Sequence, residues 1–89
     1  MFNNADNLWQ YVSDRLSEYG RAVTVGTHGS PSGLVGNHAY MVDSVYMSGT
    51  TKMVRLRNPW GSAGSAAAYV NVTAQQLFDS ISRVQSSYV

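Results

Sequence analysis

The sequence contains no cysteine. This absence excludes disulfide bonds, zinc sites built on thiolates and a cysteine nucleophile within the chain, and it gives no information about the redox compartment. The chain has two histidines and five acidic residues, and the acidic residues show no spacing typical of metal ligands. We therefore expect neither a metal ion nor another cofactor on this chain.

Charged residues are also scarce. They make up 12% of the chain, whereas about 25% is usual in a globular domain. The basic residues are scattered and the net charge is only +1, so we expect no nucleic-acid partner. No apolar run approaches the ~18 residues that a membrane-spanning helix needs, and the N-terminus lacks a signal-peptide core, so no membrane partner is expected either. The sequence does not indicate a cellular location.

What is present is typical of one small folded domain. The 89 residues are 44% hydrophobic and 11% aromatic, enough for a single modest core. Apolar residues at three- and four-residue spacing predict helices, and alternating ones predict strands. For residues 1–89 the order predicts an α+β fold: an N-terminal helix followed by a twisted antiparallel sheet of four to five strands and a second short helix. The predicted elements are a helix over 6–19, capped by Asp6 and ended by Gly20; strands over 21–27, 38–46, 50–58 and 69–72; a helix over 73–82, capped by Thr73; and a strand over 84–89.

Two of these strands, 38–46 and 50–58, form a predicted β-hairpin around a three-residue loop, 47–49. Stepping outward from this loop two residues at a time sets His38 opposite Asn58. Directly opposed residues on one face have Cβ atoms about 4.5–5.5 Å apart, so these two side chains can meet. A two-residue turn would shift the pairing by one and place them on opposite faces, unless a bulge altered the count.

The hairpin register also predicts two faces. Arg55 and Arg57, at alternate strand positions, are more typical of a solvated face than of cations that anchor a substrate, and Asp43 lies diagonal to Arg55 at pairing distance. His28, in a loop rich in glycine and serine, is interpreted as solvated, and Trp9 as a core residue of the first helix. The predicted inner face carries His38, Tyr40, Val42, Val54, Leu56 and Asn58; the outer face carries Met41, Asp43, Val45, Met53, Arg55 and Arg57.

Two short motifs of this hairpin carry a resemblance to a known family. Gly36-Asn37-His38-Ala39-Tyr40, followed by Val54-Arg55-Leu56-Arg57-Asn58-Pro59-Trp60-Gly61, resembles the His and Asn motifs of calpain-like cysteine proteases. The resemblance is strong over residues 34–61 and reaches the flanks only in the order of elements. It implies that residues 1–89 are the β-rich, C-terminal half of a papain-like protease core.

The resemblance further implies that His38 and Asn58 are catalytic residues supported by Trp60. In that family pattern, His38 takes the proton of a thiol and later protonates the leaving amine, while Asn58 fixes the imidazole and Trp60 shields their hydrogen bond from water. The implied partners are a Cys-bearing half of the protease core and a polypeptide substrate, and the chain alone should be inactive. Animal members carry Trp and acidic residues just after the Asn-Pro-Trp-Gly tetrapeptide. Because this chain does not, calcium binding, which the resemblance allows, has no support here.

Two alternatives remain. A non-catalytic pseudo-protease module would keep the scaffold and use an exposed face to bind a partner. A transglutaminase-like acyl transferase also uses Cys and His but expects Asp as the third member, which Asn58 does not match. The protease hypothesis makes one further prediction: the face near His38, Tyr40 and Trp60 is open and apolar, with the imidazole partly accessible at its edge.

Overall fold

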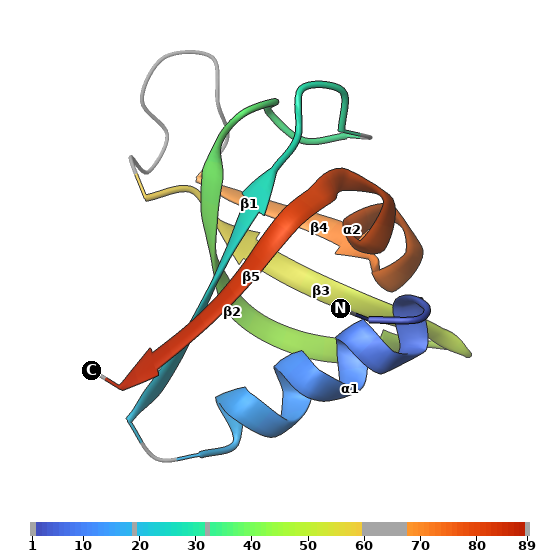
Figure 1. Ribbon diagram of the computed structural model, residues 1–89. Helices are drawn as coiled ribbons and strands as arrows, with labels where there is room; N and C mark the ends of the chain where they lie inside the picture. Colours follow the sequence, from blue (N-terminus) through green and yellow to red (C-terminus); the bar gives the residue numbers. More distant parts are fainter. Residues whose placement is uncertain (1, 19, 32, 60–67, 89) are drawn as a thin grey trace.

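The computed structural model describes residues 2–18, 20–31, 33–59 and 68–88, which form two helices and one five-stranded sheet (Figure 1). The sheet is antiparallel, with strand order β4-β3-β2-β1-β5. The predicted α+β fold is confirmed. The elements are α1 (Ala5–Leu16), β1 (Arg21–Thr27), β2 (Ala39–Ser48), β3 (Thr51–Arg57), β4 (Tyr69–Thr73), α2 (Ala74–Ser80) and β5 (Ile81–Tyr88).

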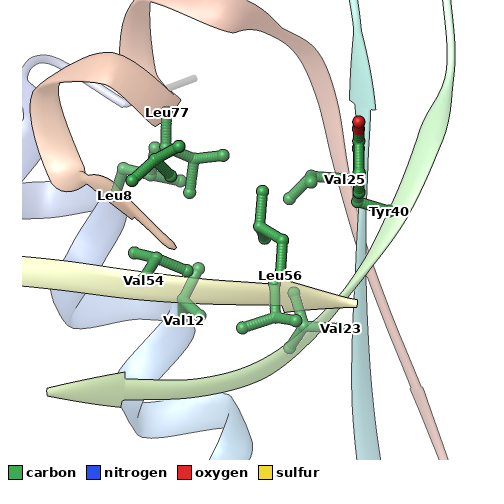
Figure 2. Close-up of a cluster of buried hydrophobic side chains, with 10 residues drawn as sticks. Leu8, Val12, Val23, Val25, Tyr40, Val54, Leu56 and Leu77 are labelled. Carbon is green, nitrogen blue, oxygen red and sulfur yellow. The ribbon is translucent and has the colours of Figure 1, made fainter. Parts of the chain in front are cut away.

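The core lies between the two helices and one face of the sheet. Leu8 and Val12 of α1 and Leu77 of α2 are fully buried against inward residues of four strands. Figure 2 shows these side chains as one cluster, with the Tyr40 hydroxyl pointing away from it. Burying an aliphatic side chain of this size stabilises the fold by about 1.5–3 kcal/mol, so this cluster is the main source of stability. The buried cluster consists of Leu8, Val12, Val23, Val25, Tyr40, Val42, Val54, Leu56, Val72 and Leu77.

The first helix begins earlier than the sequence predicts. Asn4, and not Asp6, is the N-cap: its side-chain oxygen accepts a hydrogen bond from the backbone N–H of Asn7 at 2.8 Å. Asp6 instead lies in the first turn, where its negative charge complements the helix dipole. The helix ends at Leu16 with Ser17 as the C-cap, so Gly20, with φ of 76°, belongs to the turn before β1 and not to the helix end.

The second helix is shorter than predicted. Thr73 is its N-cap, as expected, and forms a reciprocal capping box with Gln76. The helix ends at Ser80, however, because Ile81 takes an extended conformation and pairs with Thr27 of β1. The last strand therefore begins at Ile81, three residues before the predicted start.

The hairpin between β2 and β3 differs from prediction in two ways. Its turn has two residues, Gly49 and Thr50, since Ser48 pairs with Thr51. The φ of 62° at Gly49, the first central residue, is the pattern of a type II′ turn. The predicted three-residue loop was wrong because both arrangements place Gly49 at a position that needs positive φ.

The second difference is a β-bulge at Asp43. The pairs Val42–Leu56 and Ser44–Arg55 flank it, which leaves Asp43 as an extra residue in β2. A bulge bends its strand and increases the twist, and β2 is visibly curved in Figure 1. It also corrects the predicted faces: Val45 lies opposite buried Val54 and packs against the core, not outward.

Candidate functional site

His38 lies just before β2, at the end of the sheet where β1 ends and β5 begins. Its backbone is fixed on both sides by Thr27, the last residue of β1. The Thr27 N–H donates to the His38 carbonyl at 2.8 Å, and the His38 N–H donates to Thr27 Oγ1 at 2.9 Å. Thr27 Oγ1 in turn donates to the Val35 carbonyl at 2.7 Å. A single buried hydroxyl therefore fixes both His38 and the loop that leads to it.

The local conformation accounts for the residue types at the two positions before His38. Asn37 has φ of 50°, a left-handed conformation that asparagine tolerates better than most residues, and its N–H donates to the His28 carbonyl at 3.0 Å. A Cβ atom at Gly36 would lie 2.9 Å from the Gly29 carbonyl oxygen. Only glycine allows this close approach. The Gly36-Asn37 pair therefore packs the end of the loop against its start, and these contacts fix the position of His38.

Asn58 follows the last residue of β3 and is completely buried. Its N–H donates to the Ala68 carbonyl at 2.9 Å, which extends the pairing of β3 with β4 by one bond. The register of the hairpin, continued by one pair beyond Met41–Arg57, sets Asn58 opposite Tyr40. His38 is two residues from Tyr40 and therefore on the same face.

The two side chains meet, as predicted. His38 Nε2 lies 3.4 Å from Asn58 Oδ1, and the His38 ring packs edge-on against the Tyr40 ring with centroids 4.8 Å apart. Because an amide oxygen can only accept, this hydrogen bond requires the proton on Nε2, which makes Nδ1 the basic nitrogen of the neutral ring. The predicted direct opposition was wrong: the turn at Gly49-Thr50 moves the residue opposite Asn58 by three positions, from His38 to Met41, and the bulge moves it back by one to Tyr40, so His38 and Asn58 meet diagonally.

An open cleft of about 740 Å³ lies beside His38. Polar and apolar atoms both line it, and Tyr40 is only 2% exposed. The predicted exposure of Tyr40 at an open apolar face was therefore wrong, because the Tyr40 ring belongs to the core and its hydroxyl accepts from the Val35 N–H at 3.1 Å. The imidazole of His38 is half-buried at the cleft, and Trp60 lies outside the described residues. The cleft is lined by Thr27, His28, Gly29, Asn37, His38, Ala39, Pro59, Ser82 and Arg83.

His28 is partly exposed, as expected of a loop residue, but its ring is held by two hydrogen bonds. Its Nδ1 accepts from the Ser30 N–H at 3.1 Å, so its Nε2 carries the proton and donates to the Asp79 carbonyl at 2.6 Å. The backbone N–H of His28 donates to the Ser80 carbonyl at 3.0 Å. His28 thus binds two carbonyl groups at the end of α2, which ties the loop after β1 to that helix.

Other predicted positions behave as follows. Trp9 packs against the core and donates from Nε1 to the Met53 carbonyl at 3.0 Å. Arg55 and Asp43 approach to 3.9 Å on the exposed face, and Arg55 also lies over the Tyr69 ring, 4.2 Å from its centroid.

Sequence reasoning missed Thr27. The signal was a polar residue at the inward position that follows Val23 and Val25, where a third apolar residue would be expected from the alternation. A buried hydroxyl at such a position needs hydrogen-bond partners, and the chain beside it supplies them.

Within the described ranges, no three His, Asp or Glu side chains are grouped closely enough to hold a metal ion. In the same part of the chain, neither helix has the length and apolar character to cross a membrane.

Comparisons with known proteins give one finding. A family model described as calpain family cysteine protease matches residues 3–82, which is most of the chain. Searches of curated proteins and of solved structures found no significant match.

Proposed function

This chain belongs to the calpain family of cysteine proteases, and on that basis we propose that it is the half of a protease core that supplies the catalytic His38 and Asn58. The nucleophilic cysteine comes from a Cys-bearing half outside this chain, and the intact enzyme hydrolyses peptide bonds. One observation carries the proposal: His38 Nε2 lies 3.4 Å from the oxygen of a fully buried Asn58, with the imidazole at the wall of an open cleft.

In the proposed reaction, Asn58 holds the proton of His38 on Nε2, and Nδ1 takes the proton of the thiol. Pairing of thiolate with imidazolium lowers the thiol pKa well below its free value of about 8.5. The thiolate attacks the peptide carbonyl, and the imidazolium returns its proton to the leaving amine as the C–N bond breaks. Water then attacks the acyl-enzyme, with His38 again as the base, and releases the acid product. This chemistry needs no metal ion or other cofactor from the chain.

The surroundings of the pair support these roles. The distance of 3.4 Å is longer than the usual 2.9–3.0 Å, and catalytic hydrogen bonds often shorten only when the substrate is bound. Thr27 and the Gly36-Asn37 turn hold the backbone of His38, and the Tyr40 ring limits the rotation of the imidazole. Trp60, the supporting residue, shields the hydrogen bond from water in this proposal.

A second candidate is a non-catalytic module that retains the fold and binds a partner. The observation that favours it is the absence of cysteine in the chain. The two candidates differ in one measurable property, namely whether His38 can activate a thiol placed across the cleft.

The test is a chimera in which this chain replaces the His- and Asn-bearing half of another calpain-family protease. We expect the chain alone to leave casein intact and the chimera to cleave it, with activity blocked by iodoacetamide. His38→Ala should reduce kcat/KM by about 10²–10⁴-fold, and Asn58→Ala by about 5- to 150-fold. Asn3→Ala, at an exposed position before α1, is the matched control and should have no effect.

The pH dependence of thiol alkylation provides a readout separate from turnover. In the chimera the thiol should react with iodoacetamide at a pH well below its free pKa, and His38→Ala should restore the ordinary profile. A chimera that unfolds cooperatively but neither cleaves casein nor shows this shift contradicts the catalytic role and favours the non-catalytic module.

A further inference from the structure

Arg83 forms part of the cleft wall at the start of β5. It pairs with Gly26 of β1, and its side chain lies flat over that glycine: a Cβ atom at position 26 would be 2.8 Å from Arg83 Nε and 2.9 Å from Cζ. Any larger residue at position 26 would displace the guanidinium group. Gly26 therefore provides the space in which this side chain lies.

No residue in the described lining of the cleft supplies a counter-charge for this guanidinium group. Among the described residues, the Arg83 side chain has no hydrogen-bond or ion-pair partner, in contrast to Arg15, Arg21 and Arg55, which each have a carboxylate partner. None of the described residues that line the cleft is acidic. An arginine presents five N–H donors in a planar arrangement that matches a carboxylate. The guanidinium group in the cleft can therefore bind a carboxylate that comes from a ligand.

The position of Arg83 relative to His38 follows from the sheet register. Gly26 pairs with Arg83 on one side and with Ala39, the residue after His38, on the other. Neighbouring strands lie about 4.8 Å apart, so the backbones at Arg83 and Ala39 are about 10 Å apart. An extended peptide advances about 3.3 Å per residue, so this span corresponds to roughly three substrate residues. By strand alternation, Gly26, Ala39 and Arg83 lie on the sheet face opposite to that of Tyr40 and His38, and Arg83 and His38 both line the cleft at this end of the sheet.

We propose that Arg83 is a specificity-determining residue that binds a carboxylate of the substrate, carried by an Asp or Glu side chain within about three residues of the scissile bond. This inference rests on the proposed function, because it takes the cleft beside His38 as the substrate site. Arg83 acts on substrate binding and takes no part in the chemical step.

The first test measures binding to the chain alone. Blocked pentaglycine peptides with Glu or Gln at the centre are titrated into ¹⁵N-labelled protein, together with pentaglycine that has a free C-terminal carboxylate. We expect the Glu peptide to shift the Arg83 Nε–H and the Gly26 and Ala39 amides, and to bind about three- to fivefold more tightly than the Gln peptide at low salt. A terminal carboxylate that binds as tightly as the Glu side chain would overturn the assignment to an acidic side chain.

Variants then separate Arg83 from a general effect of charge. Arg83→Gln should abolish the preference for Glu, and Gly26→Ala should reduce it with the charge retained, because the added methyl group displaces the guanidinium. Arg57→Gln is the matched control: Arg57 is also an exposed strand arginine, but it lies outside the cleft lining. Preference retained in Arg83→Gln, or lost equally in Arg57→Gln, overturns the inference.

The second test uses the chimera described above with matched Glu and Gln substrates. Arg83→Gln should raise KM for the Glu substrate about three- to fivefold and leave kcat unchanged. A chimera that retains His38, shows no activity and still binds the Glu substrate more tightly than the Gln substrate would contradict the proposed function and leave the carboxylate site intact. An active chimera with no preference for Glu would contradict only the role of Arg83.

Discussion

The hydroxyl of Thr27 is the most informative single group to remove. Thr27→Val keeps the shape of the side chain and removes only the hydrogen bonds of the hydroxyl. Thr27 Oγ1 accepts from the His38 N–H at 2.9 Å and donates to the Val35 carbonyl at 2.7 Å. Each such bond contributes about 1 kcal/mol net, and a buried group that is left without a partner costs about 1–3 kcal/mol. Because Thr27 is only 5% exposed, water cannot readily replace the lost hydroxyl. We therefore expect the free energy of unfolding to fall by about 2–4 kcal/mol.

Such a loss is large for a domain of this size, whose total stability is about 4–13 kcal/mol on the usual scale of 0.05–0.15 kcal/mol per residue. The measurement is urea unfolding followed by tryptophan fluorescence. The control is Thr24→Val in the same strand, where the threonine faces outward and its hydroxyl makes no hydrogen bond to any described residue; its effect should stay within about 0.5 kcal/mol. Equal effects of the two substitutions would refute the argument that the Thr27 hydroxyl fixes His38.

Two further predictions concern the hairpin and the second helix. Deleting Asp43 removes the extra residue of the bulge and leaves every other hairpin pair in register, so nuclear Overhauser contacts between His38 and Asn58 should persist. Inserting an alanine beside Asp43 should abolish these contacts. Loss of the contacts in the deletion variant would contradict the register. Thr73→Ala removes the capping box of α2 and should lower the free energy of unfolding by about 1 kcal/mol, as measured by urea unfolding. The control is Ser48→Ala at an exposed position. A change no larger than that of the control would show that the cap is not important for stability.

The hairpin shows how far the sequence can predict this structure. Alternation of apolar residues over 38–46 and 50–58 was enough to predict two strands and to bring His38 and Asn58 to one face. The pairing itself was not predictable, because a three-residue loop without a bulge and a two-residue turn with a bulge leave the same residues facing inward near His38. Only the region between turn and bulge distinguishes them, and there Val45 changed faces.

Other differences have separate physical causes. The helix ends were misplaced because several residues near each end can cap, and the structure selects Asn4 and Ser17 through local hydrogen bonds. The roles of Thr27 and His28 depend on carbonyl groups brought close by the folded chain, and nothing in the local pattern identifies those partners. Arg83 likewise gains its position from Gly26, which is distant in the sequence and adjacent in the sheet.

The placement of β5 beside β1 also determines the order in which the domain can fold. Those two strands join Arg21 with Tyr88, 67 positions later in the chain, whereas only 20 positions separate His38 from Asn58. The entropic cost of closing a loop rises by about 0.6 kcal/mol for each doubling of its length, and contacts between distant segments slow folding. We expect the β2–β3 hairpin to form early and the docking of β5 to complete folding. During synthesis on the ribosome, His38 and Asn58 can therefore come together before β5, which carries Arg83, pairs with β1.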